Sequence, residues 1–318
     1  MEKIIIYQVF TRLFGNNNTS CVHNGDVQTN GVGKMSDFTM KALENIKKLG
    51  ATHIWYTGLI EHATQTDHTS FGIKKDNPAV VKGKAGSPYA IKDYYDIDPD
   101  LAVSVPNRMK EFENLVQRTH RAGLKFVIDF VPNHVARQYH SDSAPEGVIN
   151  LGEDDNKDCA FSNQNNFYYI PGTQLSAQFD LKDYIEFPAR ATGNDNFSAN
   201  PGINDWYETV KLNYGVDYNG GRTNHFDPIP DTWHKMLHIL LFWAGKKVDA
   251  FRCDMAEMVP VDFWHWAIPQ VKEQYPHIIF IAEVYNPAEY RNYLHYGHFD
   301  YLYDKVGLYD TLKAVTND

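Results

Sequence analysis

LKFVIDFVPNH, residues 124–134, joins an apolar run to a polar end. A helical pattern opens at Pro106, continues to about Arg121 and stops at Gly123, directly before this run. A short buried run that follows a helical segment is typical of the strands of a parallel α/β sheet. We therefore expect residues 124–131 to form a central strand, the third along the chain.

Further apolar runs alternate with helical patterns on both sides of this strand. They predict strands at residues 4–10, 51–57, 248–254, 278–283 and 299–303. The predicted helices are one capped by Ser36 and ending at Lys48, one capped by Asp231 and ending at Ala244, and one starting at Pro260. The alternation indicates βα units around a parallel sheet, and so the α/β class.

Two long stretches interrupt this alternation, residues 58–101 and residues 135–230, and both are rich in Asn, Asp, Gly and Tyr. Loops of this length inside a compact domain usually carry function or form a small subdomain. Both follow strands, on the side where parallel sheets place their active sites. We expect residues 1–134 to hold strands one to three, residues 135–230 to form an insert, and residues 231–318 to hold strands four to six.

The composition narrows the class of protein. Forty acidic and thirty basic residues leave a net charge of −10, which argues against nucleic acid as a partner. The three cysteines form no CxxC pair, so neither a disulfide framework nor a thiolate zinc site is expected. The N-terminal apolar run is too short for a signal peptide, and no run of about 18 apolar residues exists to span a membrane. Unless a leader has been removed from the chain, we expect a cytoplasmic protein without a membrane partner.

Charged residues lie at the ends of the apolar strands. Burying a charge there costs free energy, so a functional role is a reason to keep it. Arg252 and Asp254 lie two positions apart and share a face of their strand, and Glu283 ends the next strand. Asp254 and Glu283 should face each other across the mouth of the sheet, within roughly 5 to 6 Å. Two carboxyl groups so placed suit the cleavage of a glycosidic bond. Arg252 would keep Asp254 ionised, and Glu283 would have a raised pKa and act as the acid.

Four stretches carry a resemblance to a known family. DFVPNH (129–134), AFRCDM (250–255), FIAEV (280–284) and SPYAIKDYYDIDP (87–99) resemble the motifs of the alpha-amylase family, glycoside hydrolase family 13, in residue type, order and placement on strands. The resemblance implies a (β/α)8 barrel of the TIM type. It also implies that residues 135–230 correspond to the family's inserted domain B.

The same resemblance assigns roles to single residues. It implies that Asp254 is the catalytic nucleophile, that Glu283 is the general acid/base, and that Arg252 holds the nucleophile. Asp129 and His134 match the first family motif, in which the histidine contacts the sugar at the bond to be cleaved. Tyr89 matches the aromatic residue that stacks on that sugar.

The sequence also departs from the family pattern. No His-Asp pair that could supply the family's third acid follows Glu283, and the barrel is expected to be truncated after about strand six, as in a fragment of a longer enzyme. Asn133 matches the family's calcium-ligating asparagine, so calcium is the one metal that the resemblance implies. Glu257-Met258, however, stands where calcium-dependent members have Lys-His. No organic cofactor is expected.

The expected activity is retaining hydrolysis of α-1,4-glucosidic bonds in starch-like glucans and maltooligosaccharides. Two alternatives stay open: a glucan-binding fragment with impaired catalysis, and a glucanotransferase on the same scaffold. Each residue also has a structural alternative. Arg252 and Asp254 could be a strand-end ion pair, Asp129 could tie loops together, and Tyr89 could serve packing alone. The sequence does not specify an oligomeric state.

Overall fold

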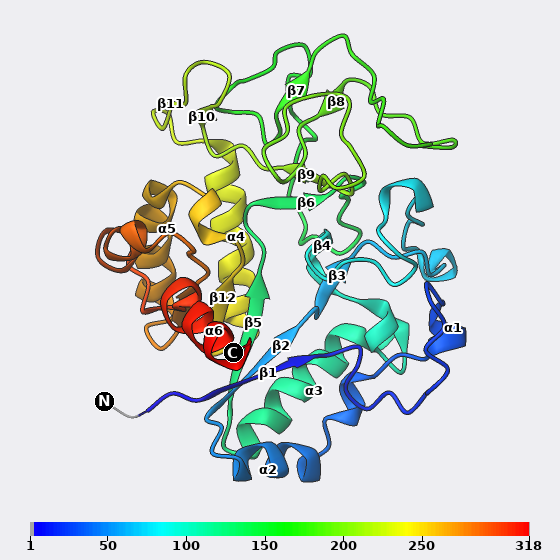
Figure 1. Cartoon of the computed structure of the whole chain (residues 1–318), viewed down its shortest axis with the longest axis vertical. Coiled ribbons are helices and arrows are strands. Elements are labelled where there is room, and N and C mark those ends of the chain that lie inside the picture. Colours follow the sequence, from blue (N-terminus) through cyan, green and yellow to red (C-terminus); the bar gives the residue numbers. More distant parts are fainter. Residues whose placement is uncertain (1–2, 318) are drawn as a thin grey trace.

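A computed structural model describes residues 3–317. Its centre is a parallel six-stranded sheet in which the spatial order of the strands follows their order in the chain. The strands are β1 (Ile6–Phe10), β2 (His53–Thr57), β5 (Lys125–Phe130), β12 (Ala250–Cys253), β13 (Ile279–Ala282) and β14 (Tyr301–Leu302). Figure 1 shows them as a curled sheet that forms half of a barrel. All six predicted strands are present, and the α/β class with a barrel-type sheet is confirmed; truncation after strand six stays a prediction.

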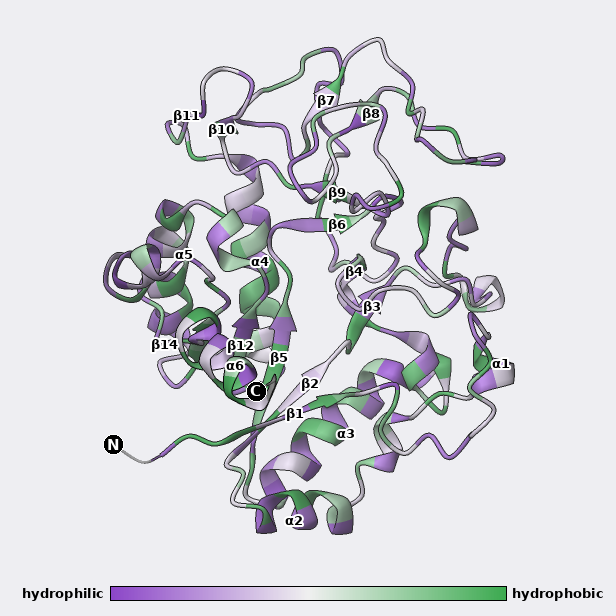
Figure 2. Cartoon of the chain, viewed as in Figure 1, coloured by the Kyte–Doolittle hydropathy of each residue, from purple (hydrophilic) through white to green (hydrophobic). Residues whose placement is uncertain are grey.

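Four helices connect the strands and cover the outer face of the sheet. They are α2 (Met40–Lys48), α3 (Arg108–Arg121), α4 (Asp231–Gly245) and α5 (Val261–Gln274). Along α2 and α3, hydrophobic residues alternate with hydrophilic ones, as Figure 2 shows. Such a pattern lets one side of a helix pack on the sheet while the other meets water.

Two predicted helix caps are wrong. Ser36 lies in a 3-10 turn (Met35–Asp37), and the cap of α2 is Thr39, whose side chain accepts a hydrogen bond from the N–H of Ala42 at 3.2 Å. Asp231 is the first residue inside α4, and Pro230 holds the cap position. The carboxylate of Asp231 pairs with Lys235 at 3.0 Å, because the side chain turns along the helix instead of back toward its first N–H groups.

The sheet buries apolar side chains on both faces, with the period of two expected for strands. On β5, Phe126, Ile128 and Phe130 belong to the main core under the helices, whereas Val127 faces the inside of the curled sheet. Inside, Val127 packs with residues of neighbouring strands, namely Ala250, Ile281, Trp55, Ile279 and Tyr303. The inner face therefore has little apolar surface, and charged groups can occupy it at the strand ends.

Short antiparallel pairs occupy the two long loops. β3 (Ile60–His62) pairs with β4 (Ile91–Ile97) in the first loop. In the second, β6 (His134–Ala136) pairs with β9 (Thr209–Lys211), β7 (Tyr169–Ile170) with β8 (Ala189–Arg190), and β10 (Val216–Asp217) with β11 (Thr223–Asn224). Figure 1 shows the second loop above the carboxyl ends of the sheet. That residues 135–230 form the family's domain B stays a prediction.

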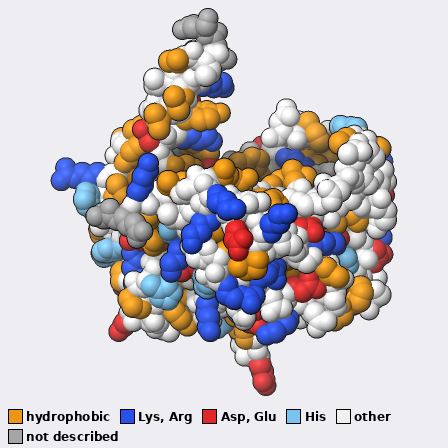
Figure 3. Space-filling view, turned by 90° about the horizontal axis from the view of Figure 1, so that it is seen from below, with side chains coloured by type: hydrophobic (Ala, Val, Ile, Leu, Met, Phe, Trp, Pro, Cys, Tyr) orange, Lys and Arg blue, Asp and Glu red, His pale blue; other side chains and the backbone are white. Residues whose placement is uncertain are grey.

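The remaining helices are α1 (Val27–Asn30) and α6 (Asp310–Asn317). Within residues 3–317, every helix is too short or too polar to cross a bilayer. At the end of the molecule opposite the second long loop, Lys and Arg side chains gather in the middle of the surface among scattered Asp, Glu and His (Figure 3). Lys and Arg side chains thus gather among uncharged and hydrophobic groups at the end of the half-barrel that faces away from the carboxyl ends of its strands.

Candidate active site

The register of the sheet brings the charged residues together. Arg252 on β12 pairs with Asp129 on β5, so both side chains point to the same inner face. Asp254 follows β12, and its N–H donates to the carbonyl of Phe130 at 2.8 Å. Glu283 follows β13, and its N–H donates to the carbonyl of Cys253 at 3.1 Å. Backbone pairing therefore fixes both carboxylates at neighbouring strand ends.

The guanidinium of Arg252 lies at the centre of these groups. Its Nη1 is 2.7 Å from Oδ1 of Asp254 and 3.1 Å from Oδ1 of Asp129, and its Nη2 is 2.7 Å from Oε2 of Glu283. Its Nε donates to the hydroxyl of Tyr303 at 2.7 Å. Only 4% of Arg252 is exposed, so one buried cation faces three carboxylates. The expected contact with Asp254 is present, and the same guanidinium also binds Glu283.

Glu283 accepts further hydrogen bonds on both oxygens. Oε2 accepts the N–H of Met255 at 2.9 Å, and Oε1 accepts the hydroxyl of Tyr285 at 2.6 Å. Lys305 in turn donates to the Tyr285 oxygen at 2.6 Å. Met255 has a φ of +45°, a left-handed conformation that is rare outside glycine and asparagine. This strained turn directly follows Asp254 and aims its N–H group at Glu283.

The two carboxyl groups differ in pKa, and in the opposite sense to the sequence-based expectation. Burial raises the pKa of Asp254 to about 7, and the negative charges of Glu283 and Asp129 add to the rise against the opposing charge of Arg252. Burial also raises the pKa of Glu283, but Arg252 and the hydrogen bonds from Tyr285 and Met255 outweigh it and lower that pKa. These directions run against the expected raised pKa of Glu283, because Glu283 receives the additional donors; which of the two carboxyl groups carries the proton stays a prediction.

A cleft of about 340 Å³ opens over this group. It is lined by residues of the strand ends and of both long loops: Lys82, Ser87, Tyr89, His134, Trp206, Glu208, Thr209, Arg252, Asp254, Met255, Glu283 and Tyr285. The volume is in the range of small-molecule sites. The structure thus places five of the six predicted catalytic and substrate-binding residues along one cleft.

The sixth, Asp129, lies below the cleft. Its Oδ2 accepts the indole N–H of Trp55 at 2.8 Å, while its Oδ1 faces Arg252. Burial lowers the pKa of His134 to about 3, with a smaller effect from the charge of Lys211, so its imidazole is neutral. The ring of Tyr89 lies 5.7 Å from the guanidinium of Arg252. Asp129 thus orients Arg252, while His134 and Tyr89 form part of the cleft wall.

Seven of the twelve lining residues were not among the predicted site residues, and four of these are Lys82, Trp206, Glu208 and Tyr285. Trp206, whose ring lies 5.2 Å from that of His134, and Glu208 come from the second long loop, and Lys82 comes from the first. Lys82 and Glu208 form an ion pair at 3.1 Å across the cleft wall. Weak periodicity in these loops gave no signal for them. Tyr285 had a signal, since it stands two positions after Glu283.

The surroundings of Asn133 do not fit a calcium ion. Oδ1 of Asn133 accepts a hydrogen bond from Nζ of Lys211, a side chain that is only 2% exposed. The same Nζ lies 2.7 Å from Oδ1 of Asp195 and donates to the carbonyl of Met258 at 3.2 Å. An ammonium group therefore lies beside the one oxygen atom, Oδ1 of Asn133, that the family resemblance implied as a calcium ligand.

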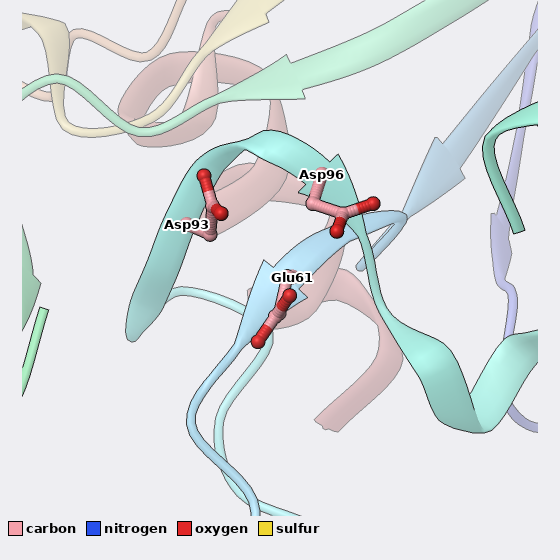
Figure 4. A group of neighbouring side chains, drawn as sticks. All are labelled: Glu61, Asp93 and Asp96. Carbon is pink, nitrogen blue, oxygen red and sulfur yellow. The ribbon is translucent and has the colours of Figure 1, made fainter. Parts of the chain in front are cut away.

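A second group of carboxylates is buried outside the cleft. Glu61, Asp93 and Asp96 lie on β3 and β4 with oxygen atoms within 4.8 Å of one another (Figure 4). Arg108 binds Asp96, backbone N–H groups of three residues bind Asp93, and Nζ of Lys92 lies 3.8 Å from Glu61. Protein groups already compensate most of this charge, and we assign no metal to the group.

A curled parallel sheet with an Asp–Arg–Glu group at neighbouring strand ends defines a class, the barrel-type α/β proteins whose site carries paired carboxylates. Residues 8–301 match the family model of the alpha-amylase catalytic domain. The chain therefore belongs to the alpha-amylase family, glycoside hydrolase family 13.

Individual relatives agree with this assignment. The chain is 28% identical over 139 residues to the alpha-1,4-glucan:maltose-1-phosphate maltosyltransferase of Cereibacter sphaeroides, which covers 42% of the chain and 22% of that protein. It is 28% identical over 261 residues to the trehalose-6-phosphate hydrolase of Bacillus subtilis, which covers 82% of the chain and 36% of that protein.

The crystal structure of an alpha-amylase from Lactobacillus plantarum superposes with a TM-score of 0.58 at 24% identity. The superposition covers 99% of the chain and 56% of that structure, and it supports the fold. The chain spans less than two thirds of the length of each of these relatives.

Proposed function

We propose that this chain carries the nucleophile and the general acid/base of a retaining glycoside hydrolase that cleaves α-1,4-glucosidic bonds in starch-like glucans and maltooligosaccharides. The observation that carries the proposal is the placement of Asp254 and Glu283 on the two Nη atoms of one buried arginine, each at 2.7 Å. Both carboxylates line the same cleft. In retaining glycosidases the two carboxyl groups lie about 5 Å apart, a spacing suited to two groups that share one guanidinium.

In the proposed reaction, Asp254 attacks the anomeric carbon while Glu283 gives its proton to the leaving glycosidic oxygen. This forms a covalent glycosyl–Asp254 bond and breaks the glycosidic bond. Water, deprotonated by Glu283, then displaces Asp254 and restores both groups. The configuration at the anomeric carbon is inverted twice and hence retained.

Because burial raises the pKa of Asp254 while Arg252 and Tyr285 lower that of Glu283, the proposed reaction requires a proton to move toward Glu283 when substrate binds. Two effects favour this move. The glycosidic oxygen accepts a hydrogen bond only from a protonated Glu283, and the positive charge that develops on the sugar stabilises an ionised Asp254. Coupled carboxyl groups share protons as a pair, and a bound substrate shifts that balance.

The cleft wall offers groups that suit a sugar ring. Tyr89 and Trp206 supply flat faces for stacking, and neutral His134, whose Nδ1 already accepts from Nδ2 of Asn133 at 3.0 Å, keeps Nε2 as a donor for a hydroxyl group. Asp129 and Tyr303 hold the guanidinium of Arg252 from below. We assign substrate contact to the first three and positioning of Arg252 to the last two.

Proton NMR of the first product tests the proposal. Maltooligosaccharide incubated with the purified chain should release the α-anomer first, and Asp254→Asn and Glu283→Gln should each remove the release. First appearance of the β-anomer would overturn the assignment of Asp254 as a nucleophile. Near-normal turnover in either variant would show that another acid is responsible.

A glucanotransferase is the second candidate, since one relative is named as a maltosyltransferase. Product chromatography separates the two reactions. A transferase lengthens some oligosaccharides while it shortens others, whereas a hydrolase only shortens them. Affinity for maltooligosaccharide without any change in the products would instead identify a glucan-binding module.

A further inference from the structure

We propose that Lys211 is a built-in cation that takes the place of a divalent metal ion where the second long loop meets the sheet. The inference concerns the stability of the fold and does not depend on the proposed activity.

Lys211 joins segments that are distant in sequence. It lies on β9, whereas Asn133 follows β5, Asp195 lies between β8 and β9, and Met258 follows β12. Its Nζ hydrogen-bonds Oδ1 of Asn133 and the carbonyl of Met258, and it forms an ion pair with Asp195. One ammonium therefore links the ends of two barrel strands to the second long loop.

The hydrogen-bonding capacity of the Lys211 ammonium group is fully used. An ammonium group has three donors, and three oxygen neighbours surround this one. The ring of Tyr218 lies 5.6 Å from Nζ and adds a favourable aromatic face. Asn133 is itself held, because its Nδ2 donates to the carbonyl of Gly193 at 2.8 Å. The oxygen atoms are thus arranged around a cation that the chain carries itself.

A calcium ion needs a different setting. It takes 6–8 oxygen ligands at about 2.3–2.6 Å and favours several carboxylates. Among residues 3–317, Asp195 is the one carboxylate within 4.0 Å of Nζ, and its charge is matched by that of Lys211. A divalent ion placed beside the ammonium would meet like charge without added ligands. Lys211 and calcium therefore exclude each other.

The junction lies next to the cleft. His134, in the cleft wall, follows Asn133 directly, and Met258 ends the 3-10 turn (Ala256–Met258) that follows Asp254 and Met255. Lys211 thereby fixes the relative positions of a substrate-contacting loop and the turn behind the nucleophile. In this arrangement a side chain does the bridging, and chelators cannot remove it.

The unaltered protein gives the first test. Metal analysis of the purified chain should find far less than one calcium per chain, and the melting temperature should be the same in EDTA and in millimolar calcium. One tightly bound calcium per chain, or a melting temperature that falls in EDTA, would overturn the proposal. This test needs no variant to fold.

Variants give the second test. Lys211→Ala removes the cation and opens space, so its melting temperature should fall by about 5 °C or more. Calcium should restore part of that loss, since the vacated space admits water molecules that can complete the coordination begun by the three freed oxygen atoms. Lys211→Met removes the charge but fills the space, and calcium should not rescue it.

Lys246→Ala is the matched control. Lys246 pairs with Glu113 at 2.9 Å, away from the junction, and its loss should give a smaller fall that calcium does not alter. A Lys211→Ala protein as stable as the unaltered one would contradict the proposal. So would equal effects of calcium on Lys211→Ala and Lys246→Ala.

Discussion

Nη2 of Arg252 lies 2.7 Å from Oε2 of Glu283, while Nη1 of the same guanidinium lies 2.7 Å from Asp254. A single side chain thus positions both members of the proposed catalytic pair. For each of the two carboxyl groups, burial is the largest effect on the pKa and raises it. The positive charge of Arg252 is the second largest effect and lowers it. The functional pair is therefore better described as a group of three.

Arg252→Lys should abolish most activity. A lysine ammonium cannot bind two carboxylates in the planar geometry of a guanidinium. We expect kcat/KM for a maltooligosaccharide to fall by about 100-fold or more. Arg252→Ala should also lower the free energy of unfolding by about 3 kcal/mol, because it leaves buried carboxylates without a cation. Exposed Arg121→Ala is the control, and an equal loss there would refute a specific role.

Asp254→Asn should change stability in a pH-dependent way. The folded state raises the pKa of Asp254 from its ordinary value of 3.8 to about 7, so ionisation of this group costs stability progressively as the pH rises from about 4 to about 7, with no further change above that. Asparagine stays neutral and avoids that cost. The variant should therefore melt a few degrees higher than the unaltered protein at pH 8, with little difference at pH 4. A lower melting temperature at pH 8 would argue against the raised pKa.

Tyr285→Phe should move the pH profile of the proposed enzyme. The hydroxyl of Tyr285 donates to Oε1 of Glu283 and helps to lower its pKa. Without it the pKa of Glu283 rises, so the acid stays protonated to higher pH. Because Glu283 has the lower pKa of the coupled pair, the acid limb of kcat/KM should shift upward by about one unit. Tyr296→Phe, which removes an exposed hydroxyl near Asp262, should leave the profile unchanged; a downward shift in Tyr285→Phe would contradict the account.

Thr39→Ala and Ser36→Ala should separate the observed helix cap from the predicted one. Both hydroxyls are exposed, but only that of Thr39 accepts an N–H from the first turn of α2. We expect Thr39→Ala to lower the free energy of unfolding by about 1 kcal/mol and Ser36→Ala to change it far less. Denaturant titration measures both, and a larger loss for Ser36→Ala would place the cap back at the predicted residue.

The strands and the charged residues at their ends could be predicted because each rests on a local pattern. An apolar run with a polar end, such as the one around Asp129, predicts a strand. Because side chains alternate between the two faces of a strand, the same run also predicts which face its last residues share. The caps of α2 and α4 could not be predicted from local sequence alone. Asp231, for example, is held by Lys235 on the same helix and by Nδ2 of Asn166 from the second long loop, at 3.0 and 2.9 Å.

The pKa shifts of the two carboxyl groups could not be predicted from the sequence. The order of the two pKa values depends on how many donors each carboxylate receives, and Tyr285 and Met255 add theirs to Glu283 alone. Lys211 escaped prediction because 78 positions separate it from Asn133, across loops with weak periodicity. The contacts of Met255 with Glu283 and of Lys211 with Asn133 form only when distant segments meet, whereas Tyr285 lies two positions from Glu283.

Trapping of the glycosyl intermediate tests the proposed roles most directly. The purified chain is incubated with a fluorinated α-glucosyl fluoride, which slows the second step, and its peptides are then mapped by mass spectrometry. The account predicts one sugar attached to the peptide that contains Asp254, and none in Asp254→Asn. A sugar on a different carboxylate, or none on the unaltered chain, would contradict it.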